Sequence, residues 1–253
     1  VSAVLFYRVL KAAFLGGREN SSLLIPKAGL SALFDRPAVH FIQSNRGKVV
    51  AGCAVDELLL EGPHVTGVRT SDGEHHAARS FVSAVPWHAI SGLLPGTEAA
   101  VRAAQTMTPS SILSIHLWFD FPVMDQDFVA LLGLRVQWVF NRSKIHGRTL
   151  ASGQWLSLTI SGADRFMEME AQEIVALAME DLKSVCPRAA ASTIIHSVVI
   201  KEKRATFAQR PEGEALRPPH TTSYNNLFLA GDWTNTGYPA TIEGAVMSGR
   251  RAA

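Results

Sequence analysis

The C-terminal segment, residues 227–253, reads LFLAGDWTNTGYPATIEGAVMSGRRAA and decides the interpretation of the fold. It opens with a short apolar run, Leu227 to Ala230, which predicts a buried strand. Gly231 and Asp232 then stand at the strand end. The missing Cβ of Gly231 would let a ligand approach the backbone, and the Asp232 carboxylate could accept hydrogen bonds from sugar-like hydroxyl groups.

A sharp turn and a helix follow this strand end. Gly237, Tyr238 and Pro239 predict the turn, and the helix is expected to begin at about Ala240. Small residues that would let another element pack closely occupy positions 244, 245, 248 and 249. A helix N-terminus presents free N–H groups and about half a positive charge, which suits an anion. The alternative is a capped C-terminal helix whose small residues serve packing alone.

Strand-like periodicity marks the stretch 49–85. The apolar run 49–55, the segment 64–70 and a third strand over about 75–84 predict a three-stranded meander. Ser71-Asp72-Gly73 is the hairpin turn before the third strand. An ordinary buried hairpin is the structural alternative for this region.

The rest of the chain mixes helices and strands without strict alternation, which indicates an α+β fold. Residues 1–15 predict an amphipathic helix, and a second short helix is expected to end at Pro37. The clearest helix should run from Asp164, as its cap, to Val185. Residues 205–224 predict a loop. The strands 111–119, 136–141 and 154–160 are expected to form an antiparallel sheet, and residues 193–200 predict another strand, rich in β-branched residues.

The composition is that of a folded domain with few charges. Of 253 residues, 47% are hydrophobic and 18% are charged, against about 25% charged in typical domains. The net charge of +2, with no basic run, provides no footprint for nucleic acid. Two distant cysteines, Cys53 and Cys186, exclude a disulfide framework and a cysteine zinc site. No apolar stretch reaches about 18 residues, so no transmembrane helix is predicted.

The N-terminal sequence VSAVLFYRVLK does not predict a signal peptide, because its charges follow the apolar run instead of preceding it. The chain does not start with methionine. We therefore expect it to be a piece of a longer protein.

These motifs resemble the C-terminal flavin-binding part of the FAD-dependent amine oxidase and phytoene desaturase superfamily. Three segments, 24–30, 85–87 and 231–249, are similar to the squalene-associated desaturase branch, also called hydroxysqualene dehydroxylase. The residues that carry the C-terminal match are Gly231, Asp232, Trp233, Gly237, Pro239, Ala240, Glu243, Gly244 and Ala245.

The resemblance implies FAD as the cofactor and assigns roles to individual residues. Asp232 would contact the ribityl–diphosphate region, and the backbone of Thr241 and Ile242 would face the flavin N1–C2=O edge. Val55 would meet the adenine, and Ala84 would lie beside the cofactor. The resemblance does not identify a catalytic residue, and it implies no metal ligand. The full expected cofactor-binding set is Val55, Ala84, Gly231, Asp232, Trp233, Pro239, Ala240, Thr241, Ile242 and Ala245.

The implied fold is the C-terminal part of a two-domain, glutathione-reductase-like flavoenzyme. Residues 1–85 and 205–253 would belong to the FAD-binding domain. Residues 86–204 would form the substrate domain, a mixed or antiparallel sheet with helices. The N-terminal Rossmann segment with its GxGxxG motif is absent from this sequence.

The implied activity is FAD-dependent redox chemistry on an apolar isoprenoid. The expected reaction converts hydroxysqualene to squalene in hopanoid-type triterpenoid synthesis. The alternatives are a phytoene-type desaturase, a flavin amine oxidase, and a non-catalytic fragment that acts as an interaction module. The resemblance further implies a bacterial cytoplasmic protein, with peripheral contact to the inner membrane as an option and no nucleic-acid partner.

The central sheet region contains aromatic residues that are candidates for lining a substrate channel and acidic residues that are candidates for acid–base catalysis. Trp118, Trp138 and Trp155 would line an apolar substrate channel or serve as ordinary core aromatics. Asp120 and Asp125 are candidates for acid–base work in a dehydroxylation, with ordinary loop carboxylates as the alternative.

Overall fold

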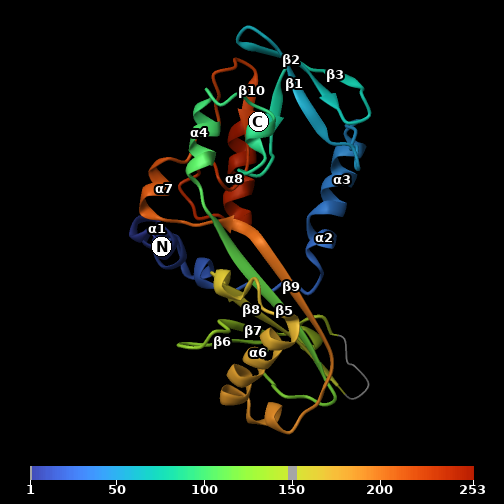
Figure 1. The fold of residues 1–253 in the computed structure, drawn as a ribbon, viewed down its shortest axis with the longest axis vertical. Coiled ribbons are helices and arrows are strands. Elements are labelled where there is room, and N and C mark those ends of the chain that lie inside the picture. The colour runs from blue at the N-terminus through green and yellow to red at the C-terminus, as the bar shows by residue number, and fades with distance from the viewer. Residues whose placement is uncertain (1, 148–152) are drawn as a thin grey trace. The chain divides into compact units, whose positions relative to one another are not determined.

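A computed structural model describes residues 2–147 and 153–253 of the chain (Figure 1). The chain divides into two compact units. Helices and strands occur in both, which confirms the predicted α+β class. Unit 1 consists of Val1–Ser22, Lys48–Thr108 and Phe207–Ala253, and unit 2 consists of Leu23–Gly47 and Pro109–Thr206.

The boundaries of these units differ from the predicted ones. The prediction groups residues 1–85 with 205–253 and separates 86–204 from them. In the structure, residues 23–47 belong to unit 2, and residues 86–108 belong to unit 1. Packing explains the second difference, because this segment shares one hydrophobic cluster with the C-terminal strand through Ile90, Leu94, Val101, Leu227 and Trp233.

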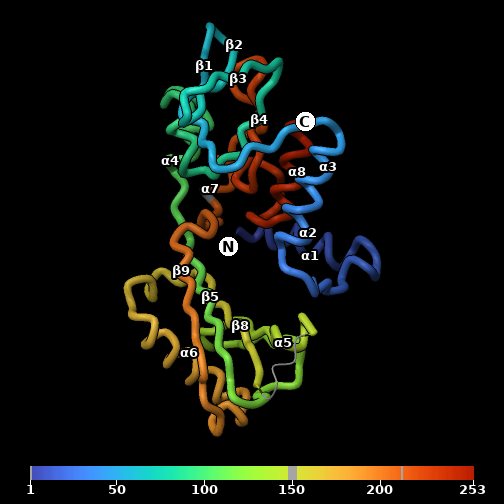
Figure 2. Tube along the Cα trace, turned by 90° about the vertical axis from the view of Figure 1, so that its right-hand side faces the viewer, coloured from blue at the N-terminus to red at the C-terminus, as the bar shows by residue number. Residues whose placement is uncertain are grey.

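Unit 1 combines a three-stranded antiparallel sheet, a parallel strand pair and several helices (Figure 2). Its strands are β1 (Val55–Glu61), β2 (His64–Thr70), β3 (His75–Ala77), β4 (Phe81–Ser83) and β10 (Leu227–Leu229). Its α-helices are α1 (Ala3–Leu15), α4 (Ala99–Thr106), α7 (Pro211–Ala215) and α8 (Ile242–Ala252).

Unit 2 is built on a five-stranded sheet in the order β6-β7-β8-β5-β9. The strands are β5 (Pro109–Phe119), β6 (Phe128–Ala130), β7 (Trp138–Asn141), β8 (Gln154–Ser161) and β9 (Ile194–Phe207). The helices are α2 (Leu30–Leu33), α3 (Asp35–Ser44), α5 (Arg142–Ile145) and α6 (Ala171–Val185). In the described part of the chain, no helix is long and apolar enough to cross a membrane.

One face of the unit 2 sheet forms the core. Successive side chains of a strand point to opposite faces, so every second residue of β5 and β8 packs beneath α6. The buried residues of this layer are Leu113, Ile115, Leu117, Leu156, Leu158, Ile174, Ala178 and Leu182. The other residues of the same strands lie on the opposite face, which does not contribute to this core.

The start of α6 differs from the prediction, which uses Asp164 as the cap. Glu170 is the N-cap, and it forms a capping box with Glu173. Asp164 instead accepts a hydrogen bond from the hydroxyl of Ser111 at 2.6 Å. The predicted end at Val185, before Cys186, is confirmed.

Three further predictions about elements are wrong for local reasons. The first strand begins at Val55 instead of residue 49, because Gly52 has a φ of 72° and interrupts the extended backbone. The predicted third strand breaks into β3 and β4, which lie in different sheets. Pro37 does not end a helix but lies in the first turn of α3, where a missing N–H costs nothing.

The predicted loop 205–224 is also partly ordered as regular structure. β9 continues to Phe207, and Pro211 begins the short helix α7. Proline suits the first position of a helix because its fixed φ is already helical.

The buried carboxylate of Asp181 ties α6 to the chain before β7. It accepts hydrogen bonds from Arg135 Nε at 3.0 Å and from the Val136 N–H at 2.9 Å. We expect Asp181→Ala to lower the free energy of unfolding by about 3 kcal/mol, because it leaves buried donors unpaired. Urea unfolding followed by tryptophan fluorescence measures this change.

Glu180 provides the matched control, because it pairs with the same Arg135 at 2.8 Å but its side chain is 65% exposed. Glu180→Ala should change the free energy of unfolding by at most about 0.5 kcal/mol. Equal losses in the two variants would contradict the assigned role of Asp181.

Candidate functional site

The candidate site in unit 1 lies where two parallel strands end side by side. β10 pairs with β4 in parallel register, Leu229 opposite Ser83, and the Ala230 N–H donates to the Ser83 carbonyl at 2.9 Å. The next residues, Ala84 on one strand and Gly231 on the other, therefore leave the sheet together. The carboxyl ends of parallel strands are a common position for ligands in α/β sheets.

Gly231 links this strand end to helix α8. Its N–H donates to Ser248 Oγ at 2.7 Å, and the same hydroxyl donates to the Ala245 carbonyl at 2.7 Å. The residue has a φ of 135°, and an added Cβ would lie 2.7 Å from the Trp233 ring. Trp233 is itself buried, with its Nε1–H donating to the Val85 carbonyl at 3.0 Å. Only glycine fits between these elements.

Asp232 places a half-buried carboxylate at the end of β10. Burial raises its pKa, while the charge of Arg217 and the backbone N–H groups of Asp232 and Trp233 oppose that rise without cancelling it. Among the described residues, no side chain donates a hydrogen bond to this carboxylate. A carboxylate with free acceptor capacity suits the hydroxyl groups of a bound ligand.

The N-terminus of α8 follows the turn and is accessible. The Thr241 hydroxyl caps the helix by accepting from the Gly244 N–H at 3.1 Å. Ile242 and Val246, one turn apart, are 53% and 49% exposed. Because the first backbone N–H groups of a helix have no partner inside it, this end can bind a group with negative charge.

Arg217 organises the loop between Gly231 and α8, and the sequence prediction missed it. Its side chain is 0% exposed and pairs with Glu214 at 3.0 Å. It also donates to the backbone carbonyls of Tyr238 at 2.6 Å and Asp232 at 2.8 Å, and to the Thr236 hydroxyl at 3.1 Å. A single arginine followed by two prolines, Pro218 and Pro219, forms no motif that would predict this role from the sequence.

The structure brings most of the predicted cofactor-binding residues together. Val55 and Ala84 line one apolar cavity of about 130 Å³, together with Ser83, whose buried hydroxyl has no partner among the described residues. The remaining predicted residues follow β10 continuously through the turn into α8: Gly231, Asp232, Trp233, Pro239, Ala240, Thr241, Ile242 and Ala245. Their contact with a cofactor stays a prediction.

A second candidate surface lies in unit 2, on the sheet face opposite α6. The register places Trp118 opposite Trp155, and their rings stack with centroids 5.3 Å apart. The guanidinium of Arg142 lies 5.5 Å from the Trp155 ring centroid, and the ring of His196 lies 4.9 Å from that of Trp118. These aromatic side chains are not core residues, because they occupy the face that α6 does not cover.

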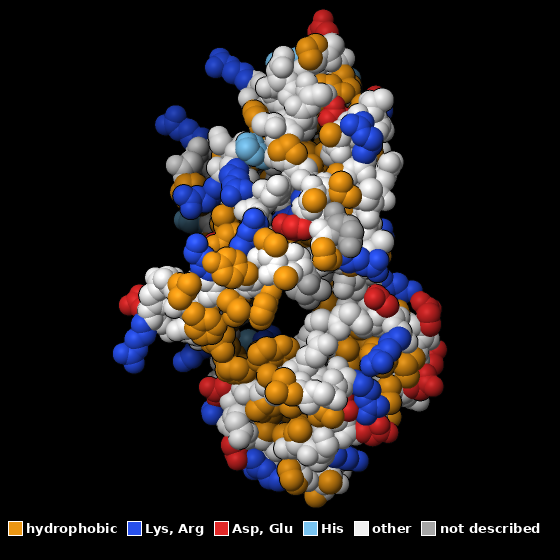
Figure 3. Space-filling view, turned by 90° about the vertical axis from the view of Figure 1, so that its left-hand side faces the viewer, with side chains coloured by type: hydrophobic (Ala, Val, Ile, Leu, Met, Phe, Trp, Pro, Cys, Tyr) orange, Lys and Arg blue, Asp and Glu red, His pale blue; other side chains and the backbone are white. Residues whose placement is uncertain are grey.

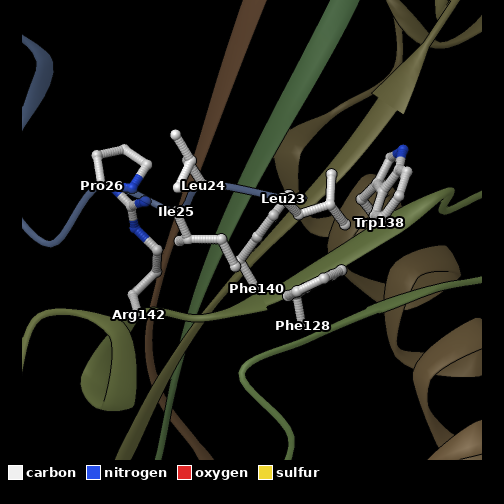
Figure 4. A pocket seen from close by; sticks show the side chains of 8 residues that line it. All are labelled: Leu23, Leu24, Ile25, Pro26, Phe128, Trp138, Phe140 and Arg142. Atoms are coloured by element: carbon white, nitrogen blue, oxygen red, sulfur yellow. The ribbon is translucent and has the colours of Figure 1, made fainter. Parts of the chain in front are cut away.

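An apolar cavity of about 270 Å³ lies over one edge of this face. The segment 23–26 covers β6 and β7, which supply the facing aromatic rings, and Arg142 points toward Pro26 (Figure 4). Hydrophobic side chains gather on the surface of unit 2 in the lower part of Figure 3. The lining residues are Leu23, Leu24, Ile25, Pro26, Phe128, Trp138, Phe140 and Arg142.

The two candidate acid–base residues have structural partners instead. Asp120 accepts a hydrogen bond from the Thr193 N–H at 2.9 Å. Asp125 forms an ion pair of 2.7 Å with Arg188, and its side chain is 79% exposed. Neither contact favours a catalytic role.

Comparisons with known proteins identify relatives of this chain. The family described as flavin containing amine oxidoreductase matches residues 12–253. Hydroxysqualene dehydroxylase from Sinorhizobium fredii is 33% identical over 255 residues, covering 100% of this chain and 57% of that protein. The protein of the same name from Rhodopseudomonas palustris is 34% identical over 265 residues, again covering 57% of its length. The chain thus spans little more than half the length of these curated relatives.

A solved structure shows the same fold. An oxidoreductase from Methanosarcina mazei superposes with a TM-score of 0.66 at 18% sequence identity. The match covers 84% of this chain and 51% of that one.

Removal of the buried guanidinium should loosen the loop that follows β10. We expect Arg217→Ala to lower the free energy of unfolding by about 3–5 kcal/mol, because Glu214, whose side chain is only 14% exposed, loses its partner together with the loop carbonyls. Arg251 is the control: it is exposed and donates to one carbonyl of the same loop, Asn235 O, at 2.8 Å. Arg251→Ala should cost about 1 kcal/mol or less in urea unfolding. A similar loss in both variants would contradict the special role of Arg217.

The charge of Asp232 should reduce the stability of the chain without cofactor. Because its pKa is raised from 3.8 in the folded state, folding is disfavoured once the pH rises through that raised value. We expect Asp232→Asn to unfold at the same temperature as the original chain near pH ~3.5. At about pH 8 it should unfold a few degrees higher. Thermal unfolding across this range tests the sign, and a variant that is less stable at high pH contradicts it.

Proposed function

The chain belongs to the flavin containing amine oxidoreductase family, and from this premise we propose that it forms part of an FAD-dependent oxidoreductase acting on an apolar isoprenoid alcohol. The proposed reaction removes the hydroxyl group of hydroxysqualene to form squalene. The observation that carries the proposal is that one chain contains both features: a glycine–aspartate strand end with an open helix N-terminus in unit 1, and an aromatic sheet face in unit 2.

The residues at the end of β10 fit a flavin dinucleotide. Gly231 has no side chain that would meet the Trp233 ring, and its N–H holds the strand end to Ser248 of α8. Asp232 has free acceptor capacity, and the buried Ser83 hydroxyl beside Ala84 has no partner among the described residues. Asp232 would hold hydroxyl groups of the cofactor, and Ser83 would hydrogen-bond to it. The backbone N–H groups at Ile242 would face its electron-rich edge. Bound FAD in its reduced form supplies the hydride that replaces the hydroxyl group, which leaves as water after it takes a proton.

The unit 2 surface supports an apolar substrate. The cavity of about 270 Å³ is lined by aliphatic and aromatic side chains, and Arg142 is the charged residue among its described lining residues. Rings of this kind offer a large apolar area and a negative face to any positive charge that develops on a substrate carbon when a C–O bond breaks. The curated relatives named hydroxysqualene dehydroxylase support the alcohol as substrate.

An amine substrate fits this surface less well. A protonated amine would meet the positive charge of Arg142, which has no acidic partner among the described residues. Among the described residues that line the cavity, none carries a carboxylate that could hold an ammonium group. The amine oxidase alternative is therefore weaker than the isoprenoid one.

The carboxylate of Asp232 should contribute to flavin retention in the holoenzyme. We expect Asp232→Ala to raise the dissociation constant of FAD about 10-fold or more, because hydrogen bonds to a charged group are lost. Absorbance of the flavin after desalting measures retention. Asp127→Ala is the control, since Asp127 pairs with Lys144 on the surface of unit 2. Unchanged flavin occupancy in the Asp232 variant would contradict the proposed site.

The reaction itself is tested with the flavin reduced under anaerobic conditions. Addition of hydroxysqualene should reoxidise the flavin and yield an equal amount of squalene. Reduction of an oxidised flavin by phytoene would instead support the desaturase alternative, and no flavin change with either compound would contradict both.

A further inference from the structure

The open face of the unit 2 sheet carries a strip of polar side chains among its aromatic ones. The strand register places His116 directly opposite Ser157, and Ser114 directly opposite Thr159. Within the described part of the chain, the hydroxyl groups of Ser114, Ser157 and Thr159 have no hydrogen-bond partner. Ser157 is nevertheless only 8% exposed. These hydroxyl groups are free to hydrogen-bond to a group outside the described residues, either water or a bound ligand.

Aromatic side chains surround this strip on the same face. On β7, Phe140 lies opposite Ser157 and Trp138 lies opposite Thr159. The stacked pair of Trp118 and Trp155 occupies the neighbouring row, two residues further along β5 and two residues earlier in β8. An extended apolar chain can therefore cover the rings while one polar group on it reaches the strip.

The hydrogen bond between Trp155 and His116 determines which ring nitrogen of the histidine carries the proton. The Trp155 indole N–H donates to His116 Nδ1 at 3.3 Å. An indole N–H is only a donor, so His116 Nδ1 must be the acceptor and Nε2 carries the proton of the neutral ring. No residue of the described ranges accepts a hydrogen bond from this Nε2–H. His116 thus presents a free donor at the aromatic face.

The surroundings of His116 keep the ring neutral. Burial lowers its pKa, and the positive charge of Arg142 lowers it further. His146 and His196 are the other titratable groups near these rings, through their contacts with Trp155 and Trp118. Protonation of His116 would also place a proton on Nδ1, against the Trp155 donor. The ring is therefore a hydrogen-bond donor at neutral pH and not a source of a proton.

We propose that His116 binds the oxygen of an isoprenoid alcohol through its Nε2–H, with Ser157 as a second hydrogen-bonding group. The aromatic side chains on either side would hold the hydrocarbon chain. This inference rests on the proposed function and deepens it, because it assigns the recognition of the hydroxyl group to named residues. A pure hydrocarbon should bind less well, because it would cover His116 and Ser157 without offering either of them a hydrogen bond.

Two probes of the same length separate recognition of the chain from recognition of the hydroxyl group. Farnesol is an isoprenoid alcohol, and farnesene is a hydrocarbon with the same carbon skeleton. Binding of each to the holoenzyme is followed by quenching of tryptophan emission, to which Trp118 and Trp155 contribute. We expect the unmodified protein to bind farnesol about 10-fold or more tightly than farnesene.

Two variants of His116 and one control variant test its role. His116→Leu removes the donor and should bind the two probes equally. His116→Gln keeps an N–H donor on a side chain of comparable reach and should retain most of the preference. His76→Leu is the matched control, because His76 lies exposed on β3 in unit 1, and it should leave the preference unchanged. Should His116→Leu not fold, Ser157→Ala replaces it and should reduce the preference about threefold.

Each other outcome has a defined meaning. Equal binding of both probes by the unmodified protein, or an unchanged preference in His116→Leu, overturns the role of His116 and leaves the proposed function standing. Binding of neither probe overturns this inference together with the isoprenoid substrate of the proposed function.

Discussion

The candidate flavin site depends on one buried guanidinium. Arg217 has no exposed side-chain surface, and its hydrogen bonds to two backbone carbonyls fix the start and the end of the loop between Asp232 and Tyr238. Loops usually lie at the surface because their backbone groups need partners. Here a charged side chain supplies those partners from inside, and Glu214 balances its charge. The position of the α8 N-terminus follows from this arrangement, because α8 begins directly after the loop.

The same region holds groups that do not favour the stability of the chain by themselves. Asp232 keeps a carboxylate in a partly dehydrated position, and the Ser83 hydroxyl has no partner among the described residues. Gly231 adopts a backbone conformation that other residues avoid. Each feature is unfavourable for folding alone, and each becomes favourable once a ligand supplies hydrogen bonds or close contact. This concentration of such groups at one strand end supports the proposed binding site over the alternative of an ordinary capped helix.

In unit 2, one face of the sheet forms the hydrophobic core, and the other face carries the proposed substrate-binding surface. Alternation along β5 sends Leu113, Ile115 and Leu117 beneath α6 and leaves His116 and Trp118 on the other side. The proposed recognition surface and the hydrophobic core therefore use different residues of the same strands. The hydrogen bond from Trp155 joins the aromatic and polar parts of that face, because it sets the tautomer of His116.

The sequence by itself determined the local features of this protein. The strand at Leu227, the turn at Pro239, the helix after it and the strands β5 and β8 follow from periodicity and turn residues, and the flavin-family motif could be recognised because its residues are contiguous. Only the tertiary structure decided which distant segments meet. The parallel pairing of β4 with β10, the burial of Arg217 under the loop and the approach of Trp155 to His116 join residues that are far apart in the chain. Long-range contacts leave no periodic trace in a single sequence, because the packing of the whole unit selects them.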